Sequence, residues 1–94
     1  MHAKPWQTNA ASRIADFLDR ENLDEQDVIA LTKFAKRLTI DPYDTMANRS
    51  HDGEWVHHIG PSVTRPDRAL AVAYRINDPY RYVEVISAFY TRLP

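Results

Sequence analysis

The last forty or so residues contain three strand-like segments in succession, and the middle one constrains the fold most. From Ala69 to Ile76 the even-numbered positions are Leu, Val, Tyr and Ile, and the odd-numbered positions are Ala, Ala, Ala and Arg. Because successive side chains of a strand point to opposite faces of a sheet, this alternation predicts a strand that packs its large residues on one face. The small residues leave room on the other face.

The neighbouring segments have the same character. Glu54 to Gly60 is a short strand-like segment led by Trp55. The turn residues Asn77-Asp78-Pro79-Tyr80 separate the middle strand from Arg81 to Thr91. Asn, Asp and Pro favour turns, so the last two segments are predicted to form an antiparallel hairpin.

Alternation in the last segment predicts which residues share a face. We expect Val83, Val85 and Phe89 on one face, and Tyr82, Glu84, Ile86, Ala88 and Tyr90 on the other. Apolar residues on both faces indicate a central strand.

Helical spacing of apolar residues fills the first half of the chain. One helix is predicted over about Ala10 to Glu21, with Thr8 or Asn9 as its N-cap. A second helix is capped by Asp24, and Asp41-Pro42 ends it because the residue before a proline avoids helical geometry. The predicted fold class is therefore α+β: an N-terminal helical hairpin packed on a twisted antiparallel sheet of three to four strands. The fourth would be a short first strand from Pro5 to Thr8.

Composition limits the alternatives. With 94 residues, 44% of them hydrophobic and 27% charged, the chain forms a single domain over 1–94. It has no Cys for disulfides or thiolate chemistry, and no apolar run long enough for a membrane helix or a signal peptide, so a cytoplasmic protein is expected. The formal net charge of −1 gives no general attraction to nucleic acid, which would need a local basic patch. With two Gly, a glycine-rich nucleotide loop is excluded.

The segment between Gly60 and Arg68 is longer than a usual hairpin loop and contains Pro61 and Pro66. Loops of this length are often functional, and a plain insertion is the alternative.

Several segments together resemble the RelE/ParE superfamily, the toxins of type II toxin–antitoxin systems. The resemblance runs from Leu31 to Tyr90 and rests on the helix end Asp41-Pro42, on Gly53-Glu54-Trp55, and on the strands Val72–Asp78 and Val83–Ser87. The segment Trp55-Val56-His57-His58-Ile59 is most similar to the Trp strand of the YoeB branch. The resemblance implies a RelE-like small domain with the helical hairpin on one face of the sheet and a concave groove on the other.

It also implies a function. Ribonuclease members of this superfamily cut mRNA on the ribosome without a metal or other cofactor, by attack of the ribose 2′-OH on the adjacent phosphate. That step needs a base for the hydroxyl proton, an acid for the leaving oxygen, and cations that stabilise the negative transition state.

The resemblance suggests four catalytic residues. His58 falls where related toxins carry an Arg or Lys, and Arg68 stands near their Arg at the start of the following strand, although the position that aligns is Ala71. Tyr90 and Arg92 match the C-terminal region where such toxins carry His, Tyr or Arg. Each also has a structural interpretation: a strand His in solvent, an Arg beside a turn, an aromatic ring over the sheet edge, and a terminal Arg in water.

A basic rim for RNA is predicted at Lys33, Lys36, Arg37 and Arg49, with a solvated helix face as the alternative. His51, His57 and His58 raise the question of a metal site. Adjacent strand residues point to opposite faces, so His57 and His58 cannot easily share an ion, and no metal is expected. Strand parity does not say which of these two faces the groove.

Two other functions stay open. A ParE-like inhibitor of DNA gyrase would act by protein–protein contact and needs no acid–base set, and a RelE-fold domain without toxicity would serve as a binding module. The resemblance also implies a cognate antitoxin, with a landing surface on the outward side of the helical hairpin and the last strand. Tyr80, Tyr82 and Tyr90 would be its aromatic anchors.

Overall fold

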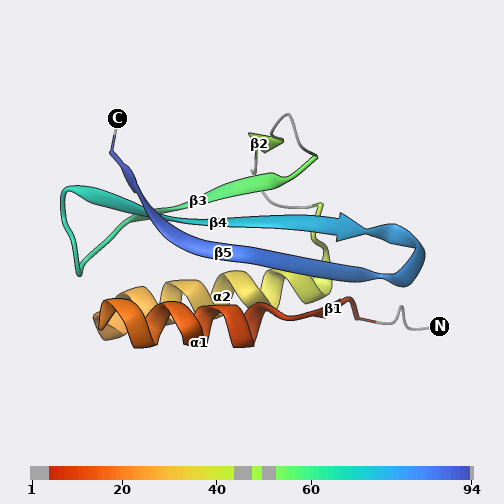
Figure 1. Cartoon of the computed structure of the whole chain (residues 1–94), viewed down its shortest axis with the longest axis horizontal. Helices are drawn as coiled ribbons and strands as arrows, with labels where there is room; N and C mark the ends of the chain where they lie inside the picture. The colour runs from red at the N-terminus through yellow and green to blue at the C-terminus, as the bar shows by residue number, and fades with distance from the viewer. Residues whose placement is uncertain (1–4, 44–47, 50–52, 94) are drawn as a thin grey trace.

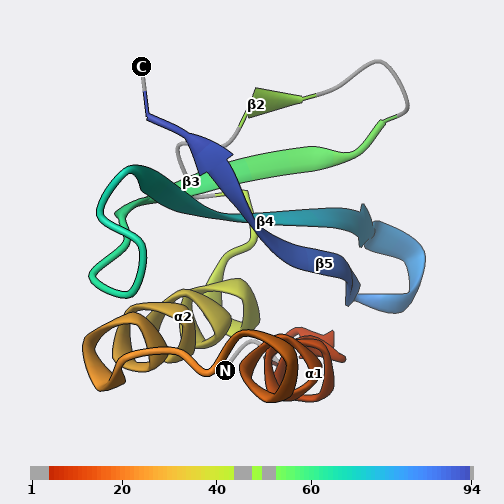
Figure 2. The same cartoon turned by 60° about the vertical axis from the view of Figure 1, so that its left-hand side comes forward.

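Two helices lie side by side under one face of a curled sheet, as Figure 1 and Figure 2 show from two directions. The computed structural model describes residues 5–43, 48–49 and 53–93. Its elements are β1 (Gln7–Thr8), α1 (Ala10–Glu21), α2 (Glu25–Ile40), β2 (Asn48–Arg49), β3 (Trp55–Pro61), β4 (Arg68–Asn77), a 3-10 turn (Asp78–Tyr80) and β5 (Tyr82–Arg92). The predicted α+β fold class is confirmed.

Both helices begin and end where local chemistry predicts. The Thr8 hydroxyl accepts a hydrogen bond from the Ala10 N–H at 3.1 Å, and α1 ends at a left-handed Asn22. The Asp24 carboxylate accepts from the Gln26 N–H at 2.9 Å, which satisfies a free donor in the first turn of α2. Asp41, before Pro42, is extended and stops this helix.

The sheet has the strand order β1-β5-β4-β3-β2. β1 runs parallel to β5, and the other pairs are antiparallel. The three long strands therefore form the predicted meander, and β1 is the short first strand expected near Thr8. The sequence did not indicate β2, because the region from Tyr43 to Gly53 has no clear period. β4 is the middle strand of this order. β5, which was predicted to be central, lies between β4 and β1 and pairs with β1 at Tyr82 and Val83.

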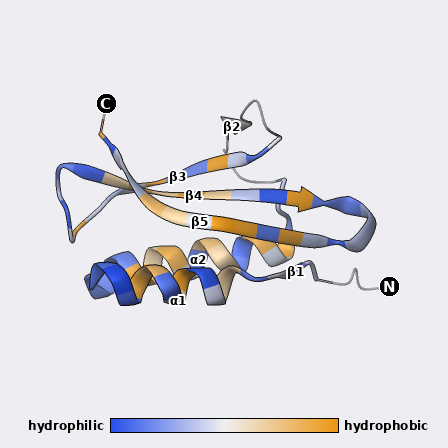
Figure 3. Cartoon of the chain, viewed as in Figure 1, coloured by the Kyte–Doolittle hydropathy of each residue, from blue (hydrophilic) through white to orange (hydrophobic). Residues whose placement is uncertain are grey.

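The core lies between the helices and the inner face of the sheet, and apolar bands recur along both helices and the long strands in Figure 3. Leu70, Val72 and Tyr74 are each at most 1% exposed, as the alternation in β4 predicts. The helices contribute buried residues to the same core: Ala10, Ile14, Phe17, Leu31, Phe34 and Leu38.

A β-bulge changes which side chains of β5 face the core. Ala73 pairs with Ser87 while Tyr74 pairs with Val85, so Ile86 is an extra residue in β5. After it the parity is inverted: Ala88 and Tyr90 join the core together with Val83 and Val85. Phe89 pairs with Ala71 and lies on the outer face. The predicted grouping of Phe89 with Val85 is therefore wrong, because alternation continues only while the ladder is regular.

No helix within residues 5–43, 48–49 and 53–93 has the length and apolar character to span a membrane.

Candidate functional site

The face of the sheet away from the helices has a floor of small side chains. Ala69, Ala71 and Ala73 point to this face from β4. In the register, His58 of β3 and Phe89 of β5 lie on either side of Ala71. Ala71 is 0% exposed, so its neighbours shield it even though neither α1 nor α2 covers this face.

At one end of this floor the neighbouring strands leave a groove of about 440 Å³, which we call the outer groove. The register of β3 against β4 shifts between His58 and Gly60, and Gly60 has a φ of 144°, a value that side-chain-bearing residues rarely adopt. The groove is lined by His58, Gly60, Pro61, Ala69, Thr91, Arg92 and Leu93. Its lining thus combines mostly apolar residues with one histidine and one arginine.

Two of the four predicted catalytic residues line the outer groove. His58 and Arg92 come from different strands, and both are exposed. Arg68 pairs with Arg92 in the ladder but is not part of the lining, and its Nε lies 3.5 Å from a carboxylate oxygen of Asp67. Arg68 therefore adds positive charge beside the groove, partly offset by Asp67.

Tyr90 lies on the opposite face. Its ring centroid is 5.3 Å from that of Phe17 in α1, and the Arg65 guanidinium lies over it at 5.2 Å. Arg65 also forms an ion pair with Glu21 at 3.3 Å. The structure does not bring Tyr90 together with His58, and the inverted parity after Ile86 is the reason.

The two adjacent histidines lie on opposite faces of the sheet. His57 pairs with Val72 and stacks on Phe34, with ring centroids 4.5 Å apart and an interplanar angle of 3°. Burial, with smaller contributions from Arg37 and His58, lowers the pKa of His57 below its usual value. His57 thus belongs to the helix-facing side, and His58 is the histidine of the outer groove.

The predicted basic rim divides into parts. Lys33 and Arg37 line a second groove, of about 290 Å³, between α2 and β3, and we call it the α2–β3 groove. Lys36 is exposed on α2 outside that lining. For Arg49 the structure describes only the backbone, which pairs with Trp55. His51 lies outside the described residues.

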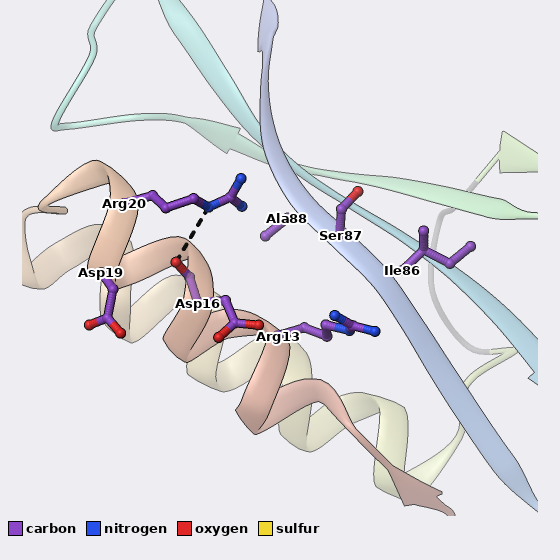
Figure 4. Close-up of a pocket in the computed structure, with 7 residues that line it drawn as sticks. All are labelled: Arg13, Asp16, Asp19, Arg20, Ile86, Ser87 and Ala88. Atoms are coloured by element: carbon purple, nitrogen blue, oxygen red, sulfur yellow. Dashed lines mark hydrogen bonds between the residues drawn. The ribbon is translucent and has the colours of Figure 1, made fainter.

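A third groove, of about 580 Å³, runs between α1 and the bulged part of β5 (Figure 4). Arg13 and Arg20 extend from α1 toward β5, and Asp16 and Asp19 come from the same helix. The Arg20 Nε donates to the backbone carbonyl of Asp16 at 3.4 Å. Two cations and two anions cancel here, so this groove shows no preference for a charged ligand.

Asp27 of α2 attaches the long loop between β3 and β4 to the helix through hydrogen bonds, and the sequence did not indicate this role. Asp27 is 2% exposed and accepts hydrogen bonds from the Ser62 hydroxyl at 2.6 Å and from the backbone N–H groups of Val63 and Thr64, both at 3.0 Å. Burial by itself opposes the charged form, but these hydrogen bonds outweigh it and hold the pKa of Asp27 below its usual value. The loop is thus a rigid support between Pro61 and Arg68, beside the outer groove.

Within the part of the chain that the structure describes, no three His, Asp or Glu side chains lie close enough together to hold a metal ion.

Comparison with known protein families finds no family model that matches the chain, and comparisons with curated proteins and with solved structures find no match either.

Proposed function

We propose that this chain is a RelE/ParE-like toxin that cleaves mRNA on the ribosome without a metal, and that the outer groove is its catalytic site. One observation carries the proposal: a histidine and an arginine from two different strands, His58 and Arg92, both line the outer groove. The resemblance of the sequence to this superfamily implies a groove on that face.

The chemistry follows from the two groups. An imidazole takes the proton of a ribose 2′-OH, the 2′-oxygen then bonds to the adjacent phosphorus to give a 2′,3′-cyclic phosphate, and the 5′-oxygen leaves and takes a proton from water. A guanidinium binds phosphate oxygens through two parallel hydrogen bonds. The Ala69 side of the groove leaves space for a ribose or a base. Arg68, next to Arg92 in the ladder, adds positive charge where the transition state is most negative. Tyr90 has no part in this scheme, because it faces the core.

Tightly controlled expression of the chain in growing cells, with mRNA integrity followed in the same cultures, tests the proposal. We expect arrest with mRNA cleavage, and loss of both in His58→Ala, Arg92→Ala and the groove-filling Ala69→Leu. Two matched controls should stay toxic. Arg75→Ala removes an Arg that is paired with Glu54 at 3.2 Å outside the groove, and Tyr90→Phe removes a hydroxyl on the other face. Cleavage that persists without His58 and Arg92 would contradict this site.

A second candidate is a ParE-like gyrase inhibitor. It is favoured by the separation of Tyr90 from His58, since contact with a protein target needs no acid–base set. Growth arrest with intact mRNA and altered plasmid supercoiling would favour the gyrase inhibitor. Normal growth would favour a binding module without toxicity.

Either toxin implies an antitoxin partner, proposed to land on the outward side of the helical hairpin and on the last strand. Tyr80 is 78% exposed and is the best aromatic anchor, whereas Tyr90 is packed against Phe17. Charge reversal of both Lys36 and Arg37 that leaves antitoxin affinity unchanged would contradict the helical half of this surface.

A further inference from the structure

One residue of the outer groove carries a buried polar group that nothing in the fold explains. Within the part of the chain that the structure describes, three buried side-chain atoms have no hydrogen-bond partner: Nδ1 of His57, the Tyr90 hydroxyl and the Thr91 hydroxyl. Of these residues, Thr91 lines the outer groove. A buried hydroxyl without a partner has given up its hydrogen bonds to water and gained none in return, so it makes the fold less stable.

The strand register places the Thr91 side chain on the outer face of the sheet. Thr91 of β5 pairs with Ala69 of β4, and Ala69 pairs on its other side with Pro61 of β3. Directly opposite residues point to the same face, so these three form one row across the end of the alanine floor. Rotation about the Cα–Cβ bond moves the Thr91 hydroxyl to another staggered position, where it can reach a molecule in the groove.

We propose that the outer groove holds a nucleobase against Pro61, Ala69 and Leu93, and that Thr91 determines base specificity by hydrogen bonding to the edge of that base. The inference rests on the proposed function in taking the ligand to be RNA. Pockets with apolar walls and a few placed polar groups suit ligands that are flat and apolar with polar edges. The volume of about 440 Å³ leaves room for the base and its ribose, and Arg92, the next residue along β5, supplies the charged donors for the phosphate.

The unpaired hydroxyl gives this inference its own signature. A hydroxyl both donates and accepts hydrogen bonds, so it can pair with the edge of a base. The hydrogen bond that the free protein lacks is then formed in the complex. Removal of the hydroxyl should therefore have opposite effects on the two states, because it relieves the free fold of an unsatisfied group but weakens the complex.

Two measurements on the full-length chain test the inference: urea unfolding, and residue-resolved NMR titration with ribose 5-phosphate and with the nucleoside 5′-monophosphates of adenine, guanine, cytosine and uracil. We expect saturable shifts at His58, Ala69 and Thr91, and tighter binding of the nucleotides than of ribose 5-phosphate. Thr91→Val keeps the shape of the side chain without its hydroxyl. It should bind the preferred nucleotide about tenfold more weakly and lose the base preference, while its urea midpoint stays the same or rises.

Two further variants are the controls. Thr91→Ser keeps the hydroxyl and should keep the base preference. Tyr90→Phe removes the neighbouring unpartnered hydroxyl, which lies on the opposite face of the sheet, so its urea midpoint should also stay the same or rise while nucleotide binding is unchanged.

Three results would overturn the inference. Shifts without saturation, or ribose 5-phosphate binding as tight as that of the nucleotides, would show that the groove has no base site. An unchanged base preference in Thr91→Val would show that the hydroxyl does not read the base. A lower urea midpoint in Thr91→Val would show that the hydroxyl has a structural partner in the free protein.

The outcomes separate this inference from the proposed function. Nucleotide binding that depends on Thr91, without mRNA cleavage in cells, would keep the base site and reject the ribonuclease. Cleavage in cells with the same base preference at the cut sites in the parent chain and in Thr91→Val would keep the ribonuclease and reject the role of Thr91.

Discussion

At the residue scale, Asp27 shows how one buried carboxylate fixes a long loop. Asp27→Asn loses the charge-assisted bonds to Ser62, Val63 and Thr64 and should lower the free energy of unfolding by about 1–3 kcal/mol in urea titrations at pH 7. Asp24→Asn is the matched control in the same turn, and it should change little because Asn caps helices as well as Asp does. Equal losses in the two variants would mean that helix capping, not loop attachment, is the main effect.

The lowered pKa of Asp27 gives the same prediction a pH dependence. The ordinary value is 3.8, so in the unfolded chain this carboxyl takes up its proton first as the pH falls. Its stabilisation is therefore fully present above about pH 4 and is lost as the pH falls through the lower pKa of the folded state. Urea titrations at pH 3 and pH 5 should differ more for the parent chain than for Asp27→Asn, and equal differences would assign the effect to other carboxylates.

His57 contributes a second pH dependence in a milder range. Its pKa in the folded chain lies below the usual 6.5, so the unfolded state binds the proton first and stability falls as the pH drops below about 6.5. His57→Phe keeps a ring against Phe34 and should flatten this decline between pH 7.5 and pH 5.5 in urea titrations. A variant that keeps the full decline would show that another group titrates.

At the element scale, Asn9 acts as a short extension of β1 along the edge of β5. The Val85 N–H donates to the Asn9 side-chain oxygen at 2.6 Å, and the Asn9 amide donates to the Val85 carbonyl at 3.1 Å. These two hydrogen bonds resemble the pairing of two neighbouring strands, and they lie just before the bulge at Ile86. Sequence analysis offered Asn9 as a helix cap, and its side chain instead joins α1 to the sheet.

Asn9→Ala should therefore weaken the contact between α1 and β5. Two hydrogen bonds are lost, and we expect a loss of about 1–2 kcal/mol in the free energy of unfolding, together with faster hydrogen exchange at Val85. Thr8→Ala is the comparison, because it removes only the hydroxyl that accepts from Ala10. Unchanged exchange at Val85 in Asn9→Ala would contradict this role.

At the scale of the whole molecule, one core joins the helical layer to the sheet. Trp6 precedes α1 and Trp55 begins β3, and each ring meets Tyr43 edge-on, at 6.1 and 6.3 Å. In the single-Trp variants Trp6→Phe and Trp55→Phe, fluorescence and far-UV circular dichroism should give the same urea midpoint, because small single-core domains unfold in one step. A Trp55 transition that comes before the loss of helix would show that the edge of the sheet opens by itself.

The sequence by itself determined the two helices and the three long strands of this protein. The bounds of α1 and α2, the three long strands and the core face of β4 follow from caps, proline and apolar periodicity, all of which act over a few residues. The histidine and arginine that line the outer groove were named as candidates by the resemblance of the sequence to the RelE/ParE superfamily, not by these local signals.

Tertiary structure decided which of those residues meet. One extra residue at Ile86 turns Tyr90 to the core and Phe89 outward, and a strand pattern does not reveal it. Residues far apart in the chain also decide which face His58 occupies and how Ser62 buries Asp27. They likewise bring Lys33 and His57 into the lining of one groove. Local propensity fixes what each segment becomes, but strand register and long-range hydrogen bonds fix which side chains share a site.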